Sequence, residues 1–394
     1  MFFKVWHMYT RLLKLPLDGE ESIFLFGPRG TGKTFWITTQ IPNAVHINLL
    51  KFSSYQKLSN QPESLIEFIP PGYEGWIVID EVQRIPELLN EVHDQIEAHG
   101  RKFILTGSSS RSLKRKGVNL LAGRALQYHM HPLLCDEIGD QFDIKKTLEF
   151  GLLPKAQLSD TPQKYLETYI RNYIREEVFQ EALARNINAF FRFLEAASFS
   201  QGQMLNILNI SREVGVERAT ISNYFDILED LLIGVRIEAF TKRAQRDIKT
   251  HSKFYYFDVG VYRTLRPAGY LDSPEEMDSA ELETLFLQST RAINDYHELK
   301  YGIYFWHTAA NLEVDFVLYG KRGLFAFEIK RTRRVDKKML RGLKAFKKDY
   351  PEAKLYLVYM GFEKLFVDDI HIIPIAELLK SLSLILKNDH PNKK

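Results

Sequence analysis

Short apolar runs, separated by longer mixed segments, dominate the first third of the chain. Three of these runs, at residues 23–26, 76–79 and 103–105, contain no polar position, which is typical of parallel strands buried on both faces. A fourth strand is expected at 44–49. Residues 86–99 carry apolar positions at helical spacing, so we expect a helix with one buried face. This alternation predicts an α/β fold.

The pattern changes in the middle of the chain. Residues 161–197 have apolar positions at helical spacing, and 204–232 predict two helices joined by a turn at Gly215, as in a helix-turn-helix. Residues 235–240 and 253–258 predict two further strands, which we interpret as the wing of a winged helix. The expected tip of this wing carries four basic residues, Lys242, Arg243, Arg246 and Lys249. Such a module either contacts DNA or serves as a spacer or protein-docking unit, and the sequence leaves both open.

The first apolar run leads directly into a glycine-rich loop. Its residues have the spacing G-x-x-x-x-G-K-T and are Gly27, Pro28, Arg29, Gly30, Thr31, Gly32, Lys33 and Thr34. Glycines let the backbone close around an anion, and the helix that begins at Lys33 adds the positive end of its dipole. Lys33 would neutralise the β- and γ-phosphates, and Thr34 would hold Mg²⁺. The motif predicts a nucleoside triphosphate site, with ATP and Mg²⁺ as cofactors.

Polar residues that follow the other buried runs are candidates for the same site, because open α/β sheets bind ligands at the carboxyl ends of their strands. Asp80 would hold Mg²⁺, directly or through water, and Glu81 would orient and polarise the attacking water. The competing interpretation is a helix N-cap at Asp80 beside a surface glutamate. Ser108 either senses the γ-phosphate or lies in an ordinary serine-rich turn. Arg124 reaches a phosphate in its own subunit or in the neighbour of a homo-oligomer, or is simply an exposed or helix-capping side chain.

A second candidate site lies in a hairpin near the C-terminus. Residues 313–319 and 324–330 predict two strands, and a turn at 320–323 would place Glu328 opposite Asp315. Glu328 and Lys330 are two residues apart and therefore share a face of the strand. Two carboxylates and a lysine on one patch suit metal-assisted cleavage of a phosphodiester, in which the lysine positions or activates water. The alternative is a hairpin with ordinary surface charges and a salt bridge.

A run of positive charge begins at Lys330. Ten of the nineteen residues at 330–348 are lysine or arginine, and only Asp336 offsets them within the run. A solvated helix face normally mixes both signs, so this basic stripe predicts contact with DNA phosphates.

Composition adds a few limits. A chain of 394 residues is long enough for two or three domains, and its net charge of +3 is too small by itself to indicate nucleic acid. Cys135 is the only cysteine, which excludes an intramolecular disulfide and a thiolate metal cage. No apolar run approaches the length needed to cross a bilayer, so we expect no membrane partner and a cytoplasmic location.

Four motifs together carry a family resemblance. They are the loop at 27–34, IVIDEVQRIP at 77–86, LTGSSSR at 105–111 and LAGR at 121–124. They resemble those of archaeal and bacterial AAA-type ATPases that end in a nuclease-like domain of uncharacterised function, and the resemblance covers nearly the whole chain. It implies a P-loop NTPase three-layer α/β/α core in residues 1–135. A helical linker with a winged-helix domain would follow in 136–262, and a restriction-endonuclease-like α/β domain in 263–394.

The order of Asp315 and then Glu328-x-Lys330 also resembles the restriction-endonuclease-like (PD-(D/E)xK) nucleases, and Glu283 matches the acidic residue on their first helix. The resemblance implies a second metal site on Glu283, Asp315 and Glu328, with Lys330 as a catalytic residue. Domains of this fold also occur as scaffolds without cleavage. We therefore expect an ATP-hydrolysing protein that acts on DNA and has a candidate nuclease domain. The alternative is a nucleotide-dependent switch or scaffold that binds DNA or protein without cleaving.

Overall fold

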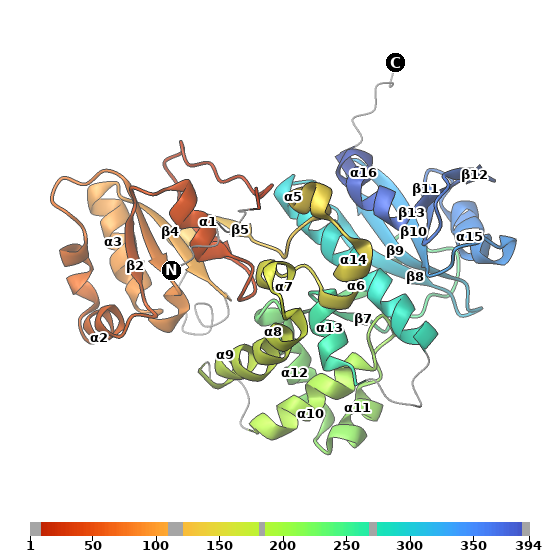
Figure 1. Ribbon diagram of the computed structural model, residues 1–394, viewed down its shortest axis with the longest axis horizontal. Coiled ribbons are helices and arrows are strands. Elements are labelled where there is room, and N and C mark those ends of the chain that lie inside the picture. The colour runs from red at the N-terminus through yellow and green to blue at the C-terminus, as the bar shows by residue number, and fades with distance from the viewer. Residues whose placement is uncertain (1–8, 109–120, 181–185, 268–273, 388–394) are drawn as a thin grey trace.

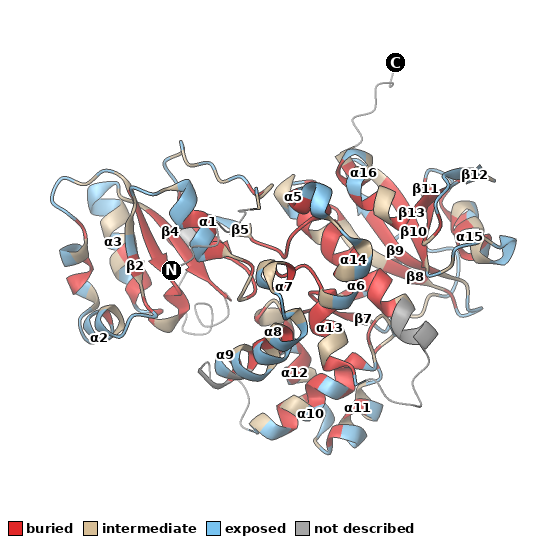
Figure 2. Cartoon of the chain, in the orientation of Figure 1, coloured by how far each residue is buried: buried red, intermediate tan, exposed pale blue. Residues whose placement is uncertain are grey.

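The computed structural model describes residues 9–108, 121–180, 186–267 and 274–387, so residues 109–111 of the third motif lie outside the described residues. A five-stranded sheet lies at one end of the molecule and an eight-stranded sheet at the other, with a group of helices between and below them (Figure 1). The central strands of both sheets are buried, whereas most helices are buried only on their inner faces (Figure 2).

The five-stranded sheet confirms the predicted parallel α/β core. Its order is β2-β3-β4-β1-β5, and each neighbouring pair is parallel. The strands are β1 (Ser22–Phe26), β2 (Val45–Asn48), β3 (Trp76–Asp80), β4 (Lys102–Gly107) and β5 (Ala125–His129). The helices are α1 (Lys33–Gln40), α2 (Phe52–Asn60) and α3 (Leu88–His99), the last beginning two residues later than expected.

Alternate residues of the strands explain the three layers. Phe24 and Phe26 of β1 pack with Leu88 of α3, whereas Ile23 and Leu25 of the same strand pack with α1. Successive side chains of a strand point to opposite faces, and a run without polar positions can therefore bury both faces of the sheet. The result is the predicted α/β/α core of a P-loop fold. β4 lies between β1 and β3, so the loop after β1 and the carboxylates after β3 share one edge of the sheet.

Helices fill the middle of the chain, and most of them share one core. They are α5 (Cys135–Ile138), α6 (Ile144–Phe150), α7 (Pro154–Leu158), α8 (Pro162–Thr168), a π-helical turn (Tyr169–Ile174), α9 (Arg175–Gln180), α10 (Ile187–Ser198), α11 (Ile207–Val214), α12 (Arg218–Asp230) and α13 (Val259–Leu265). Most of these helices, from α8 to α13, contribute to one cluster that includes Leu166, Phe190, Phe225 and Val261. Gly215 has φ of +74° and joins α11 to α12, which is the turn predicted from the sequence.

The two predicted wing strands form, but they do not stand free. β6 (Gly234–Ala239) and β7 (Lys253–Tyr256) pair antiparallel, and β6 also pairs with β8 of the large sheet. The expected basic tip contacts the C-terminal region. Arg246 pairs with Asp349 at 2.7 Å, and Lys249 Nζ donates to Asn311 Oδ1 at 2.6 Å. Two of the four basic residues at the expected tip are thus held by partners that are distant in the sequence.

The eight-stranded sheet has the order β12-β13-β11-β10-β9-β8-β6-β7. The remaining strands are β8 (Gly302–His307), β9 (Glu313–Gly320), β10 (Gly323–Lys330), β11 (Lys354–Tyr359), β12 (Leu365–Val367) and β13 (Ile370–Pro374). Helices α14 (Pro274–Tyr296) and α16 (Ile375–Lys387) cover one face, and α15 (Arg341–Asp349) packs on the other. Because β6 and β7 of the middle segment join this sheet, the division at residue 262 stays a proposal.

The register of the β9–β10 hairpin agrees with the prediction. Leu324 pairs with Tyr319 and Phe327 with Phe316, and the next pair in this register is Glu328 and Asp315. The turn is shorter than expected, because Gly320 and Gly323 pair with each other and leave two residues between the strands. Both carboxylates therefore lie side by side on neighbouring strands.

Replacing Gly151 by alanine should lower the free energy of unfolding by about 3 kcal/mol or more. Gly151 has φ of +70°, and a Cβ atom there would lie 2.0 Å from Asp258 Oδ1. Gly100→Ala is the matched control, because Gly100 has φ of +61° with nothing within 4 Å of a Cβ atom. It should lose only about 1 kcal/mol, the cost of the backbone conformation. Equal losses in urea unfolding would contradict a close packing of α6 on α13.

Candidate functional site

The glycine-rich loop has the shape that an anion site requires. Gly30 and Gly32 adopt φ of +86° and +94°, which favour glycine, and α1 begins at Lys33. The buried ammonium of Lys33 lies inside the loop and donates to the carbonyls of Gly27 at 2.6 Å and Pro28 at 3.2 Å. Burial lowers the pKa of Lys33, while Glu81 and Asp80 oppose that shift. The loop therefore holds a desolvated cation at the point where phosphates would lie.

Thr34 and Asp80 are brought together as predicted. The Thr34 hydroxyl donates to Asp80 Oδ2 at 2.9 Å, and the Thr106 hydroxyl donates to the other carboxylate oxygen. Hydroxyl and carboxylate oxygens are the ligands that Mg²⁺ prefers, and the phosphate oxygens of a nucleotide would complete such a site. Asp80 is therefore part of a hydrogen-bonded pair at the loop, not a helix N-cap.

Glu81, Gln83 and Ser108 form a chain of hydrogen bonds beside the loop. Glu81 has φ of +63° and lines the cleft, and the Gln83 side-chain amide donates to it and to Ser108. Ser108 in turn donates to Glu177 of α9 at 2.8 Å. Burial is the main cause that raises the pKa of Glu177, and the negative charge of the nearby Glu81 adds to it. Ser108 thus connects the nucleotide core to the helical region, a role that the sequence did not suggest.

The P-loop residue Arg29 also contacts the helical region. Its guanidinium lies 3.2 Å from Glu176 and 3.6 Å from Glu177, and it stacks on the ring of Tyr173 at 4.7 Å. Glu176 and Glu177 follow the π-helical turn, and no motif in the sequence marks them. The pairing of Arg29 with Glu176 and Glu177 therefore could not be predicted from the sequence, because folding alone brings them together.

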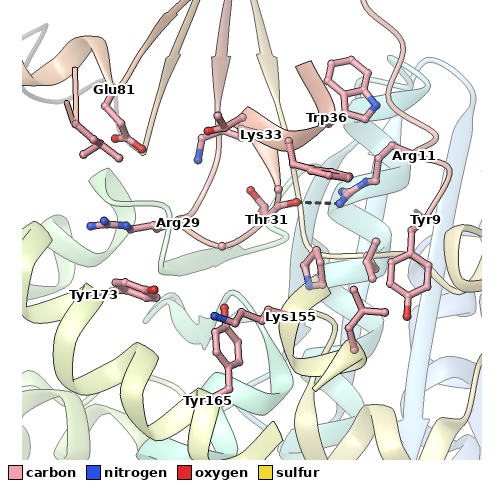
Figure 3. A pocket seen from close by; sticks show the side chains of 18 residues that line it. Tyr9, Arg11, Arg29, Thr31, Lys33, Trp36, Glu81, Lys155, Tyr165 and Tyr173 are labelled. Carbon is pink, nitrogen blue, oxygen red and sulfur yellow. Dashed lines mark hydrogen bonds between the residues drawn. The ribbon is translucent and has the colours of Figure 1, made fainter. Parts of the chain in front are cut away.

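A cleft of about 620 Å³ opens in front of the loop (Figure 3). Lys33 and Glu81 lie on its nucleotide-core side, and Tyr165 and Lys155 face them from the helical region. The lining also includes apolar and aromatic side chains that suit a flat heterocyclic base, namely Tyr9, Trp36, Leu133, Pro154 and Leu158. The cleft thus combines a phosphate-binding end with an apolar wall.

Arg11 holds the back of the loop in place, and no motif in the sequence marks this residue. Its guanidinium donates to the carbonyls of Thr31 at 3.0 Å and His131 at 2.6 Å. It also contacts Glu137 at 3.1 Å and the Tyr296 hydroxyl at 3.0 Å. All of these partners except Thr31 are more than a hundred residues away in the sequence, and a lone arginine near the start of a chain gives no signal of such a role.

Arg124 is not brought to the cleft. It lies exposed after β4, where it forms an ion pair with Glu97 of α3. Of the residues predicted for the nucleotide site, it is therefore the one that the structure places elsewhere. Its predicted role on a neighbour's phosphate in a homo-oligomer stays a prediction.

The second candidate site is a cluster of buried charges at the end of β10. Lys330 Nζ lies 2.7 Å from Glu328 Oε1 and 3.7 Å from Asp315 Oδ2, and Asp315 Oδ2 also accepts the Ile329 amide at 2.7 Å. Glu328 Oε2 is buried and has no hydrogen-bond partner. Burial, and then Asp315, raise the pKa of Glu328 despite the nearby ammonium, so this carboxyl retains its proton at a higher pH than an exposed one.

Glu283 lies near this cluster on α14, and a buried lysine that we did not predict lies between them. Glu283 accepts a hydrogen bond from the Tyr255 hydroxyl at 2.8 Å, and Lys253 pairs with Glu313 at 2.5 Å. Burial, and then Asp315, raise the pKa of Glu283. Lys253 begins an apolar run, and a buried lysine in such a run is a signal that we did not use. In the described ranges, no three His, Cys, Asp or Glu side chains are grouped to hold a metal ion. The expected three-carboxylate set is therefore not assembled as a metal site in this arrangement, because Lys330 pairs with Asp315 and Glu328 and the Tyr255 hydroxyl donates to Glu283.

Three family profiles match successive parts of the chain. Residues 19–139 match an AAA domain, and residues 141–272 and 279–378 match two domains of unknown function, DUF8612 and DUF4143. Uncharacterised proteins of Mycobacterium tuberculosis and Methanocaldococcus jannaschii are 23% and 24% identical, over 79% and 94% of this chain and 71% and 90% of their own. The structure of the Aeropyrum pernix Orc1 protein in complex with DNA is 12% identical, covers 62% of this chain and 86% of its own, and has a TM-score of 0.27, too low to support an argument.

The AAA profile and the observed loop and sheet order support a P-loop domain of the AAA type at residues 19–139. They do not show a restriction-endonuclease-like domain. No helix in the described part of the chain is long and apolar enough to cross a membrane.

Tyr296→Phe should weaken nucleotide binding about fivefold, because the hydroxyl accepts from both Arg11 and the His131 amide behind the loop. Tyr301→Phe is the matched control, since its hydroxyl donates to the Leu386 carbonyl, away from the loop. Both variants should lose some stability, but only Tyr296→Phe should change the dissociation constant for a fluorescent ATP analogue. A similar change in both variants would contradict a specific support of the loop by Tyr296.

Proposed function

We propose that this protein binds ATP with Mg²⁺ and hydrolyses it. The observation that carries the proposal is the hydrogen bond between Thr34 and Asp80, 2.9 Å long, beside the buried Lys33. A hydroxyl after the loop lysine and a carboxylate at the end of another strand of the sheet are the protein ligands of Mg²⁺ in P-loop hydrolases. The AAA profile over residues 19–139 supports the same assignment.

Different residues of the cleft would have different roles in hydrolysis. Lys33 would exchange the carbonyls of Gly27 and Pro28 for the β- and γ-phosphates, and the loop amides would bind the same oxygens. Glu81 would hold and polarise the attacking water, and Gln83 fixes the position of its carboxylate. Bound Mg²⁺ would supply charge neutralisation at the phosphates.

We also propose that the protein acts on DNA. The support is the exposed basic segment after β10, in which Arg333, Arg334, Lys337 and Lys338 are all exposed to solvent. The paired helices α11 and α12 are a second candidate contact, although the hairpin tip beside them is occupied by protein partners. A homo-oligomer and a cytoplasmic location stay predictions.

A second candidate activity is metal-assisted cleavage of a phosphodiester at Asp315, Glu328 and Lys330. One observation favours it: Glu328 Oε2 is buried without a partner, next to a second carboxylate and a lysine. Against it, Lys330 occupies the space between the two carboxylates, and no three-carboxylate group is assembled in the described residues. The competing role is a scaffold that binds without cleaving, within a nucleotide-dependent switch.

Lys33→Ala should reduce ATP turnover about a hundredfold or more, because the cation that faces the β- and γ-phosphates is lost. Glu81→Gln should retain ATP binding but lose hydrolysis. Lys57→Ala is a suitable control, since this lysine lies on α2 in an exposed pair with Glu67. Phosphate release measured for the three variants tests the proposal, and unchanged turnover in Lys33→Ala would refute it.

If the cluster is a nuclease site, wild type cleaves DNA in the presence of Mg²⁺ or Mn²⁺, whereas Asp315→Ala and Lys330→Ala do not. The physical reason is that each variant removes one of the groups that surround Glu328. Lys57→Ala is the control, because Lys57 on α2 pairs with Glu67, outside the basic stripe and away from the charge cluster. No cleavage by wild type, or equal cleavage by all four proteins, would assign the cluster a scaffold role.

A further inference from the structure

The carboxyl edge of the large sheet gathers several features outside the charge cluster. β10, β11 and β13 are parallel, so the segments that follow β10 and β11 leave the sheet at one edge. The Met360 amide after β11 donates to the Thr332 carbonyl after β10 at 2.9 Å, which places these two segments side by side. Open sheets bind ligands at this kind of edge. We define this edge surface by its basic segment, 331–338, and its aromatic segment, 361–366.

Phe362 is an exposed aromatic residue on an ordered loop. Its side chain is 82% exposed, and neighbouring hydrogen bonds hold its backbone. The Tyr359 hydroxyl donates to the Glu363 carbonyl at 2.7 Å and accepts from the Glu363 amide at 3.3 Å. Phe366 follows on β12, is 62% exposed and lies 4.8 Å from the His371 ring. A ring held outward in this way contributes nothing to the core and can stack on a flat partner at little cost in conformational entropy.

The basic segment carries a positive charge that only Asp336 offsets within it. Arg333, Arg334, Lys337 and Lys338 are exposed, and within the described ranges none of these four side chains forms an ion pair. Asp336, the acid among them, accepts the Lys338 amide at 2.8 Å. Four exposed cations without ion pairs, on a segment that runs beside the aromatic segment, favour a polyanionic partner over a protein surface, because a protein partner would have to desolvate them.

From this arrangement we propose that the edge surface binds single-stranded DNA, with Phe362 as the platform on which an unpaired base stacks. The proposal deepens the DNA action proposed above and rests on it. Cations track the sugar-phosphate backbone, and an aromatic ring binds the face of a base. In a duplex these faces are covered by neighbouring base pairs, so the exposed ring favours the single strand. The bound strand would lie next to Lys330 and Glu328, which end β10 at the same edge.

Fluorescence anisotropy with the full-length protein and a labelled oligothymidylate tests the proposal. Phe362→Ala should weaken binding about tenfold or more, the usual effect of losing one stacking side chain. Phe362→Trp should restore binding. Arg333→Ala with Arg334→Ala should weaken binding and reduce its salt dependence, because two phosphate contacts are lost. Phe52→Ala is the matched control, since Phe52 on α2 is 75% exposed and lies in the first domain.

Four results would overturn the proposal. The first is that Phe362→Ala and wild type bind the oligothymidylate with equal affinity, and the second is that a matched duplex binds as tightly as the single strand. The third is that an oligouridylate binds more tightly than the oligothymidylate. The fourth is that Phe362→Ala loses a protein contact while it retains DNA binding. If only the arginine variant weakens binding, the stacking platform is refuted but the action on DNA stands. If wild type binds neither the single strand nor the duplex at low salt, the stacking platform and the action on DNA are both refuted. ATP turnover in Lys33→Ala is measured independently and still tests the ATPase.

Discussion

The buried guanidinium of Arg11 is the contact on which the arrangement of the two ends of the molecule depends. A charge removed from water is stable only if its hydrogen bonds are satisfied, and Arg11 finds its partners on four different segments. One is the backbone of the phosphate loop at Thr31, and another is Tyr296 at the end of α14. The geometry of the loop is thus tied to a helix of the C-terminal region.

The helix α14 connects the two candidate sites. Tyr296 at its end contacts the loop support, and Glu283, thirteen residues earlier, faces the second charge cluster. At 1.5 Å per residue these two positions are separated by about 20 Å along one rigid element. Each site therefore shares a structural element with the other, although the two sheets have separate cores.

The lysine of each candidate site has a different kind of partner. In the nucleotide cleft, Lys33 is bound only to carbonyl oxygens, which a phosphate can replace because it offers a stronger charge interaction. At the end of β10, Lys330 is bound to two carboxylates that are themselves buried. The first site is ready for an anionic ligand, whereas the second is neutralised from within.

The sequence by itself determined the parts that depend on local pattern. Apolar runs identified the buried strands, glycine spacing identified the phosphate loop, and the hairpin length correctly paired Asp315 with Glu328. The tertiary structure decided what depends on contacts between distant segments. It placed Glu177 beside Ser108, turned Arg124 toward Glu97, docked the expected wing tip, and put Arg11 behind the loop. The physical reason is that hydrophobic periodicity and backbone conformation are local properties, whereas a charge takes whichever partner the folded chain brings within reach.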